Sequence, residues 1–434
     1  MGYNLAMGEI KLRALVKNPV STGGYRIHPR DLHHFVQVPW KIPAYFDSCS
    51  KKVFPLYLQE WSDLNPDPSG FKKFFPGSHP FFRHLSYLQY FLAWKNGKLA
   101  GRIAVYIDKN YHENGVQDPI GWIGLFECIE CHKVAETLLK EAIKTLKEQG
   151  ATKIIGPARF NANGEIGLLI DGFQHHPMFM EPYHPPYYQE YFESFAQKEN
   201  DWYAFLVKTT TMKTFIDRIN SLGSKGKSLR QKISAQGIQI RSLSRSKFKQ
   251  DVAAIKRLYN QAWDTDRHPQ FEYFDDAEFN YIAQGLKMMA LYEWVLLAEK
   301  NLSPQKEIVA CSVMIPDLNE VIDAWDQEHK HWMRSFARIP FWKWLWRDLM
   351  IFRHLKKRLK LKVFKHARIF ILGSLAKKNG LDALLYLESY ELAKIYGLLA
   401  GSGSQIADIN LEMINPMKRM SDVTFTWRVY QFNI

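Results

Sequence analysis

Apolar and polar positions divide the first half of the chain into short strands and one strongly periodic helix. Residues 121–128 form an apolar, β-prone run, GWIGLFEC. Over residues 132–149 the apolar positions recur with the spacing of one buried helical stripe. Gly150 stands where a left-handed helix cap is expected, and the run KII at 153–155 begins another strand. The pattern predicts a compact β-α-β unit whose two strands are parallel.

A hairpin is predicted directly before this unit, and a similar hairpin recurs in the second half. Residues 87–94 and 99–107 are apolar runs joined through Asn96-Gly97, and Asn-Gly between two such runs is a strong hairpin signal. Residues 295–299 and 308–315 repeat the pattern, after predicted helices over 248–263 and 278–289. The second half is therefore expected to be a degenerate repeat of the first.

Length and charge narrow the class of protein. The chain has 434 residues, of which 46% are hydrophobic and 14% aromatic, enough for two well-cored domains. Its 58 Lys and Arg against 44 Asp and Glu give a net charge of +14. Such a charge favours cofactor phosphates, nucleic acid or an anionic membrane surface as partners. No helix-turn-helix, zinc-finger, RRM or KH signature accompanies it, so nucleic acid is not the expected partner.

The sequence offers no export signal and no membrane span. The N-terminus lacks a basic stretch followed by an apolar run, and residue 6 is Ala, which is a poor myristoylation match. No stretch of 18 uncharged apolar residues occurs. Four cysteines are too few for a disulfide framework in a chain of this size. We therefore expect a cytoplasmic protein.

One cysteine pattern has the spacing of a c-type haem attachment motif. Residues 128–132 read Cys128-Ile-Glu-Cys131-His132. The pentapeptide is predicted to span a buried strand end and a helix start, which is the wrong context for haem. No second Cys/His pair supplies further ligands for zinc. The sequence therefore predicts neither haem nor a metal, and the two cysteines are interpreted as small apolar residues.

These elements together resemble the GNAT (acyl-CoA N-acyltransferase) superfamily. The resemblance is carried by FLAWKNGKLAGRIAVYID at 91–108, the strand GLFE at 124–127, the helix 134–150, the strand KIIGP at 153–157 and the turn NANGEIGLLIDGF at 161–173. Within the superfamily the sequence looks most like a poorly characterised bacterial subfamily with two tandem GNAT-type units. The resemblance covers the chain from about residue 38 to the C-terminus.

The resemblance implies an α/β fold of tandem GNAT-like units, each a mixed central sheet flanked by helices. We place the N-terminal unit at 1–208, a basic helical connector at 209–237 and the C-terminal unit at 238–434. The C-terminal unit carries an inserted aromatic and basic helix at 336–365. Acyl-CoA is the implied co-substrate, and an amine is the implied acceptor.

GNAT enzymes hold the coenzyme A pyrophosphate on backbone N–H groups of a glycine-bearing loop between the fourth strand and its helix. In the first unit this place reads ECIECHKV, without glycine and with two glutamates, which argues against coenzyme A binding there. The second unit retains a glycine and two lysines. The cofactor-binding candidates are Gly373, Lys377, Lys378, Asn379 and Gly380.

The resemblance also suggests catalytic and substrate-binding residues. Glu127, at a strand end, or Glu412 would act as general base, and Tyr430 as general acid. A capping role is the structural alternative for Glu127, and packing is the alternative for the tyrosines. The candidate substrate-binding residues are Asn161, Asn163, Glu165, Tyr187, Tyr188, Asn319 and Asn415.

The segment 336–365 has the most unusual composition in the chain. It begins with Trp342, Trp344 and Trp346, and between 347 and 365 it has eight Lys and Arg against one acid. Large aromatics followed by a basic end are typical of a helix that lies on a membrane surface. The alternative is a helix packed on the second unit with a solvated basic end.

The resemblance and this segment together predict the function. We expect an acyltransferase that moves an acyl group, long-chain by this hypothesis, from acyl-CoA to an amine. The acceptor would be membrane-associated, such as a sphingoid-type base, with the protein peripheral on the inner face of the cytoplasmic membrane. The alternative is a non-catalytic GNAT-fold protein that has lost turnover and kept a ligand cleft.

Overall fold

The structure is a computed structural model that describes residues 9–18, 24–67, 79–112, 118–161, 163–221, 225–263, 268–289, 291–302, 306–329, 341–375 and 380–434. The first half contains β1 (Ile10–Ala14), β2 (Val16–Lys17), β3 (Arg26–Ile27), α1 (Pro29–Gln37), η1 (Val38–Lys41), η2 (Pro43–Phe46), α2 (Tyr57–Asp63), η3 (Pro80–Arg83), β4 (Leu85–Lys95), β5 (Lys98–Asp108), β6 (Ile120–Cys128), α3 (His132–Glu148), β7 (Lys153–Gly156), β8 (Leu168–Asp171), α4 (Tyr188–Glu193) and β9 (Ala196–Lys208).

The second half begins with two helices, α5 (Thr209–Ser221) and α6 (Lys225–Ala235). They are followed by β10 (Ile238–Ser242), α7 (Phe248–Ala262), α8 (Asp276–Met289), η4 (Tyr292–Trp294), β11 (Val295–Asn301), β12 (Lys306–Pro316), α9 (Asn319–Glu328), α11 (Phe341–Leu361), β13 (His366–Ser374), α12 (Leu381–Ile395), β14 (Ala400–Ala407), α13 (Leu411–Lys418) and β15 (Val423–Phe432).

The predicted local units form as expected. β4 and β5 are an antiparallel hairpin, and Asn96 and Gly97 at its turn both have positive φ, 52° and 73°, as a two-residue hairpin turn requires. β6 and β7 are parallel and joined by α3. The second half repeats this order, with the hairpin β11–β12 and the parallel pair β13–β14 joined by α12. The predicted α/β fold with mixed sheets is confirmed.

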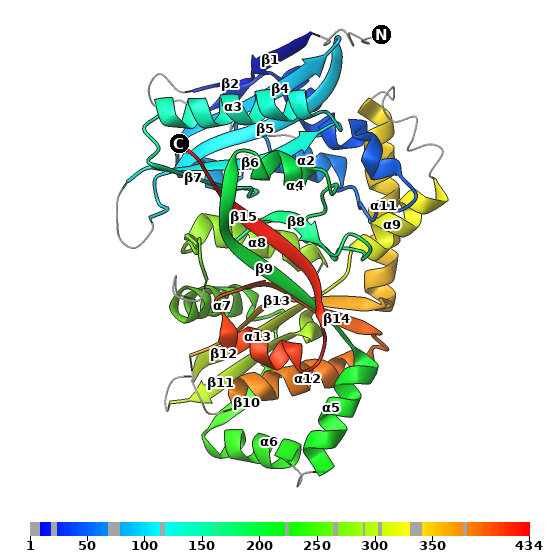
Figure 1. The fold of residues 1–434 in the computed structure, drawn as a ribbon. Helices are drawn as coiled ribbons and strands as arrows, with labels where there is room; N and C mark the ends of the chain where they lie inside the picture. Colours follow the sequence, from blue (N-terminus) through cyan, green and yellow to red (C-terminus); the bar gives the residue numbers. More distant parts are fainter. Residues whose placement is uncertain are drawn as a thin grey trace.

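The two halves share one sheet because β9, the last strand of the first half, and β15, the last strand of the second half, are exchanged between them. The strand order is β1-β4-β5-β6-β7-β15-β9-β14-β13-β12-β11-β10. β15, the last strand of the chain, pairs with β7 of the first half, whereas β9 pairs with β14 of the second half. β9 and β15 pair antiparallel with each other, and they cross the centre of the molecule in Figure 1. The domain boundaries at 208 and 238 stay a prediction, since each half completes the sheet of the other.

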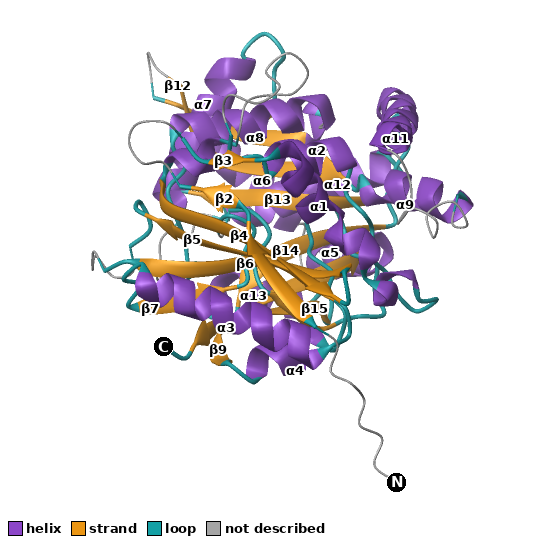
Figure 2. Ribbon diagram, turned by 90° about the horizontal axis from the view of Figure 1, so that it is seen from above, coloured by secondary structure: helices purple, strands orange, loops and turns teal. Residues whose placement is uncertain are grey.

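Helices cover both faces of the first-half strands. α3 packs its periodic stripe, with Leu138, Leu139 and Leu146 fully buried, against one face of β5 and β6. α1, η1 and α2 supply buried aromatic residues to the opposite face. Figure 2 shows these two layers on opposite sides of β4, β5 and β6. The connector helices α5 and α6 lie against α12 in the second half.

The predicted helix in 336–365 forms as α11, and residues 336–340 lie outside the described part. Trp344 is 1% exposed and stacks edge-on against Trp40, with ring centroids 4.7 Å apart. Arg347 is fully buried: its Nη2 donates to Asp326 Oδ2 at 2.8 Å and to the Phe54 carbonyl at 3.0 Å. These two residues therefore join α11 to the first half and do not belong to a solvent-facing or membrane-facing surface.

Among the described residues, none of the helices is both long enough and apolar enough to cross a bilayer.

The strand exchange predicts that one core substitution destabilises both halves together. Trp427 on β15 is 0% exposed, and its indole N–H donates to the Pro182 carbonyl at 2.8 Å. We expect Trp427→Ala to lower the free energy of unfolding by about 3–5 kcal/mol. In urea, amide protection in α3 and in α12 should be lost in one transition. The control Trp342→Ala, at a 60% exposed residue, should change stability by less than about 0.5 kcal/mol. Loss of protection in only one half would contradict the shared core.

Candidate functional site

The sheet contains two parallel strand pairs, and ligands in α/β sheets bind beyond the carboxyl ends of such strands. In the first half β6 is paired with β7 only over Ile120–Trp122. In the second half β13 and β14 are in register over His366–Ile369. Beyond these residues the strands are no longer paired with each other. Each half therefore has one candidate crevice at equivalent places in the fold.

The first crevice is filled by the chain's own side chains. Glu127, at the end of β6, accepts a hydrogen bond from the Tyr45 hydroxyl at 2.7 Å, and the Tyr188 hydroxyl lies 3.0 Å from the same carboxylate oxygen. Lys52 Nζ lies 3.9 Å from the other oxygen. Burial, followed by the charge of Glu127, raises the pKa of Tyr45 and Tyr188 well above its usual value. Both phenols therefore stay neutral and keep their hydroxyl protons for the hydrogen bonds to Glu127.

Backbone groups at the end of β6 are also occupied. The Cys128 N–H donates to the Tyr188 hydroxyl at 2.6 Å, and the Tyr187 hydroxyl donates to the Cys128 carbonyl at 2.8 Å. These main-chain groups therefore already have hydrogen-bond partners within the chain. The structure thus brings together Glu127, Tyr187 and Tyr188, as a packed network and not as the wall of an open cleft.

The second crevice is open and mainly apolar. A cavity of about 170 Å³ lies between β13, β14, α12 and α13. Five methionines contribute to its lining, and Gln405 and Asn410 supply polar side chains along β14 and after it. Its described lining contains no Asp, Glu, Lys or Arg. The methionines are Met212, Met314, Met413, Met417 and Met420.

A bulge in β14 shapes this cavity. The pairing of β14 with β9 shifts between Gly403 and Ile406. The hydroxyls of Ser402 and Ser404 both donate to Glu181 Oε1, at 2.8 and 2.6 Å, on the side of the strand away from Gly403. The buried carboxylate therefore fixes the bulge. A Cβ at Gly403 would lie 2.8 Å from the Met417 methyl, so glycine keeps this side of the strand open toward α13.

His268 and Trp263 lie at one end of the cavity. The rings of these two residues have centroids 5.6 Å apart, and His268 Nε2 lies 3.3 Å from the Asn410 side-chain amide. Trp263 also covers Gly373, where a Cβ would lie 2.3 Å from the indole. Gly373 is therefore required by this aromatic packing. Gly380 caps α12 with φ of 86°, and the other cofactor candidates, Lys377, Lys378 and Asn379, lie outside the described residues.

The remaining catalytic candidates lie in different halves. Glu412 is exposed in the first turn of α13, and partial burial, followed by the charge of Glu412, raises the pKa of the half-buried Asp382 in α12. Tyr430 is fully buried on β15 opposite Gly156 of the first half, with its hydroxyl 3.4 Å from Glu193. Burial raises the pKa of this phenol. The structure does not bring Glu412 and Tyr430 together, and their catalytic roles stay predictions.

The predicted substrate-binding residues are divided among several places. Asn161 and Asn163 contact the loop before α8, where their side-chain amides donate to the Glu272 carboxylate and carbonyl, each at 3.0 Å. Glu165 lies near the Arg159 guanidinium. The Asn319 amide donates to the Pro177 carbonyl at 2.9 Å, at the start of α9. Asn415 is exposed on α13. Their binding roles remain predictions.

Sequence reasoning missed several polar residues that the structure places at these sites. Tyr45 and Lys52 come from a Pro-interrupted segment without periodicity, so nothing in the pattern connects them with Glu127. His268 follows a helix and has no motif around it. The one sequence signal that was available for Trp263 is its place at the end of an amphipathic helix.

The fold defines the class: the chain has a tandem GNAT fold, in which the second half repeats the element order of the first, as the sequence predicted. A GCN5-related glucosamine N-acetyltransferase region of a fungal multidomain GH3 β-N-acetylglucosaminidase aligns with 99% of this chain and 38% of that chain. The TM-score is 0.50 and the sequence identity 11%, so the likeness concerns the fold.

Two curated relatives match by sequence. Protein YghO of Escherichia coli (strain K12) is 30% identical over 235 residues, which is 54% of this chain and 56% of that protein. The chain thus aligns with little more than half the length of this relative. The bacterial ceramide synthase of Caulobacter vibrioides (strain NA1000 / CB15N) is 26% identical over 348 residues, 80% of this chain and 78% of that protein. No protein-family model matches the chain.

A neutral histidine beside the first crevice predicts acid sensitivity. The Leu169 N–H donates to His184 Nδ1 at 3.1 Å, and burial, followed by the charge of Lys52, lowers the pKa of His184 to about 3. Between that value and the unfolded pKa of about 6.5 the unfolded state binds more protons. The stability from neutral His184 is therefore complete above pH ~6.5 and is lost as the pH falls toward ~3.

The test compares urea unfolding of the wild type and His184→Gln at pH 7 and pH 5. The wild type should lose on the order of 1–2 kcal/mol more than the variant between the two pH values. Equal losses in both proteins would mean that the pKa of His184 is the same in the folded and the unfolded state, which would contradict the prediction.

Proposed function

We propose that the chain is an acyl-CoA-dependent N-acyltransferase whose acyl thioester binds in the second-half crevice. The observation that carries this proposal is the contrast between the two crevices. The first is occupied by Tyr45, Tyr188 and Glu127, whereas the second holds a cavity at the carboxyl ends of β13 and β14.

The chemistry of the cavity favours a long acyl chain. Its apolar walls are formed by aliphatic, methionine and aromatic side chains, and methionine adapts to flexible apolar ligands. Each methylene group that leaves water contributes about 0.8 kcal/mol. An uncharged lining adds no desolvation cost for a buried ionic group. A palmitoyl chain should therefore bind more tightly than an acetyl group.

The polar residues at the cavity suggest how the transfer proceeds. His268 is the described lining residue whose side chain normally titrates near neutrality, and it would take the proton from the attacking amine. Peptide N–H groups of the β14 bulge would polarise the thioester carbonyl. The N-terminus of α12 beyond Gly380, with the predicted Lys377 and Lys378, would hold the coenzyme A phosphates.

A relative supports the class of acceptor. The Caulobacter protein is named a bacterial ceramide synthase, and a ceramide is the N-acyl amide of a long-chain base. By this analogy the acceptor here is a long-chain amine, and the reaction forms an amide with release of the coenzyme A thiol. The amine would reach its site from a membrane surface.

The alternative is a GNAT-fold binding protein without turnover. It is favoured by the filled first crevice and by the absence of glycine from the loop between β6 and α3. Such a protein would still bind an acyl chain in the second crevice but would produce no amide.

Thioester binding tests the proposed site. Gly401 lines the cavity, and a Cβ there would meet only the Ala367 carbonyl at 3.7 Å, so Gly401→Phe should fill the cavity without disrupting the strand. At 100 times the dissociation constant, palmitoyl-CoA should stabilise the wild type by about 2.7 kcal/mol in a thermal-shift experiment. Acetyl-CoA should stabilise it less, and Gly401→Phe should abolish the shift.

The matched control is Gly285→Phe on α8, where a Cβ would meet nothing within 4 Å. It should keep the wild-type shift. Lys377→Ala/Lys378→Ala should weaken binding of every thioester alike. No shift with any thioester would contradict the enzyme, and a shift with no amide from palmitoyl-CoA and a sphingoid base would favour the binding protein.

The exposed face of α11 supports contact with a membrane surface. Trp342, Trp346 and Leu349 are 60%, 43% and 54% exposed at helical spacing. Lys356 and Lys357 are exposed two turns further on. Apolar side chains beside cations on one helix are typical of interfacial binding to anionic lipid.

Vesicle sedimentation tests this contact. Lys356→Ala/Lys357→Ala should weaken binding to vesicles that contain anionic lipid by about 1 kcal/mol per charge. Trp342→Ala/Trp346→Ala should weaken vesicle binding both at low salt and at high salt. Lys140→Ala/Lys144→Ala removes two exposed lysines from α3 and should have no comparable effect. Equal loss in both lysine variants would indicate attraction by net charge alone.

A further inference from the structure

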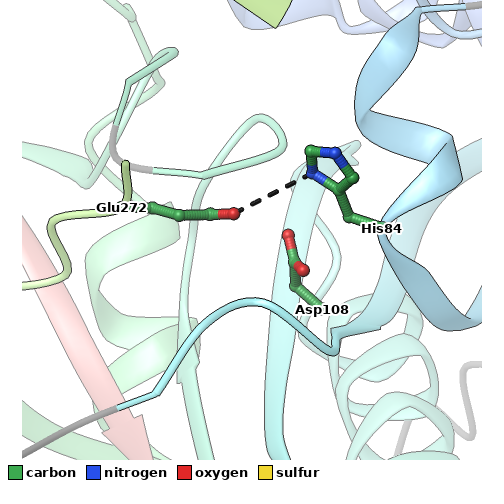
Figure 3. A group of neighbouring side chains, drawn as sticks. All are labelled: His84, Asp108 and Glu272. Carbon is green, nitrogen blue, oxygen red and sulfur yellow. Dashed lines mark ion pairs between the residues drawn. The ribbon is translucent and has the colours of Figure 1, made fainter. Parts of the chain in front are cut away.

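A buried cluster of acidic side chains and one histidine joins the two halves of the molecule away from both crevices. His84 follows η3 and Asp108 ends β5 in the first half, whereas Glu272 lies in the loop between α7 and α8, and Glu278 in α8, in the second half. All four are less than 9% exposed. Figure 3 shows the side chains of His84, Asp108 and Glu272 converging from three separate segments.

Each of the four side chains presents one buried polar atom without a hydrogen-bond partner. These atoms are His84 Nδ1, Asp108 Oδ2, Glu272 Oε1 and Glu278 Oε2. His84 Nδ1 lies 4.0 Å from Glu272 Oε1 and 3.7 Å from Glu278 Oε2. Ligand atoms of His84, Asp108 and Glu272 all lie within 4.8 Å of one another. Buried polar atoms normally have partners, so several that face one point indicate a missing one.

The other polar atoms of these side chains are held in place. Asp108 Oδ1 accepts from the Asn110 N–H at 2.8 Å, and Glu272 Oε2 accepts from the Asn161 amide at 3.0 Å. His84 Nε2 lies 2.9 Å from Asp275 Oδ2. A carboxylate on one imidazole nitrogen fixes the ring so that the other nitrogen presents its lone pair, the arrangement found around histidine metal ligands.

We propose that His84 Nδ1, Asp108 Oδ2 and Glu272 Oε1, with Glu278 Oε2 as a fourth donor, bind one divalent transition-metal ion that links the two halves. One imidazole with carboxylates suits Zn²⁺ or Mn²⁺ better than Mg²⁺ or Ca²⁺, which prefer oxygen ligands alone. Metal–ligand distances of about 2.0–2.2 Å require the donors to move together only slightly.

Charge gives the same indication. Three buried carboxyl groups, those of Asp108, Glu272 and Glu278, face one imidazole in this cluster. A second cluster offers a contrast. It consists of Asp317, Glu320 and His366. The Glu320 carboxylate accepts a hydrogen bond from the Lys365 N–H at 3.1 Å and lies 2.8 Å from His366 Nδ1. Its oxygens already have partners, and it needs no ion.

The site has a consequence for the loop that it would hold. Glu272 and His268 lie on the same connection between α7 and α8, and His268 lines the second-half cavity. A metal at Glu272 would fix one end of this loop against the first half. The inference itself does not depend on the proposed acyltransferase activity, because metal content and stability measure it directly.

The experiment uses the full chain, stripped with chelator and then dialysed against Zn²⁺ or Mn²⁺. The wild type should retain about one equivalent by elemental analysis and show a higher Tm when loaded. Glu272→Gln should lower metal affinity at least tenfold, while the control Glu320→Gln should keep it. Asp275→Asn, at a side chain that is 43% exposed, replaces the carboxylate beside His84 Nε2 and keeps an amide oxygen that can accept from the Glu278 N–H, as Asp275 Oδ1 does at 2.7 Å. It should lower affinity by tenfold or more even if Glu272→Gln does not fold.

Two results would overturn the proposal. One is a wild type that retains no more metal than Asp275→Asn. The other is a Glu272→Gln variant whose Tm is higher than that of the stripped wild type, together with no change in the Tm of either protein when metal is added. This result would mean that the cluster holds a proton shared between Asp108 and Glu272.

Discussion

β15 lies between β7 and β9, and this position makes the two halves one folding unit. Without β15, one edge of β7 would be unpaired, and β14 would be the remaining strand that pairs with β9. An unpaired edge strand exposes a row of backbone donors and acceptors. The strands also bring buried aromatic residues such as Trp427 and Trp202 into the core that the two halves share. Each crevice is therefore built on a sheet that the other half completes.

This arrangement allows the two halves to differ. In the first half, the crevice between β6 and β7 is closed by Tyr188 and by Tyr45, which arrives from the N-terminal segment. In the second half, glycines at 401 and 403 and the bulge held by Glu181 leave a cavity beside β14. A filled crevice gains aromatic packing and hydrogen bonds, whereas an open one forgoes them. The first half thus contributes stability and surfaces, and the second half contributes the space for a ligand.

The sequence was sufficient for the local elements because their signals are local. The stripe of α3, the Asn96-Gly97 turn and the repeated hairpin each lie within a window of about 20 residues, and all were predicted. The exchange of β15 was not predicted, since its pairing with Gly156 joins residues more than 250 positions apart. For the same reason Glu127 was identified at a strand end, but its partners Tyr45 and Lys52 were not. In the segment 336–365, composition indicated a basic helix. Only the packing shows that Arg347 is buried and hydrogen-bonded both to Asp326 and to the Phe54 carbonyl of the first half.

The same contrast applies to the buried polar contacts between the halves. Arg347 satisfies its guanidinium with Asp326 and two carbonyls, so this buried charge is neutralised and fully hydrogen-bonded. Arg159 from the first half pairs with Glu60 at 2.6 Å and with Asp63, to which Tyr281 of the second half also donates. At the Arg347 and Arg159 contacts the structure therefore pairs opposite charges. Around His84 and Glu272, by contrast, an excess of carboxylates faces a single imidazole. A bound cation would make this last contact follow the same physical rule.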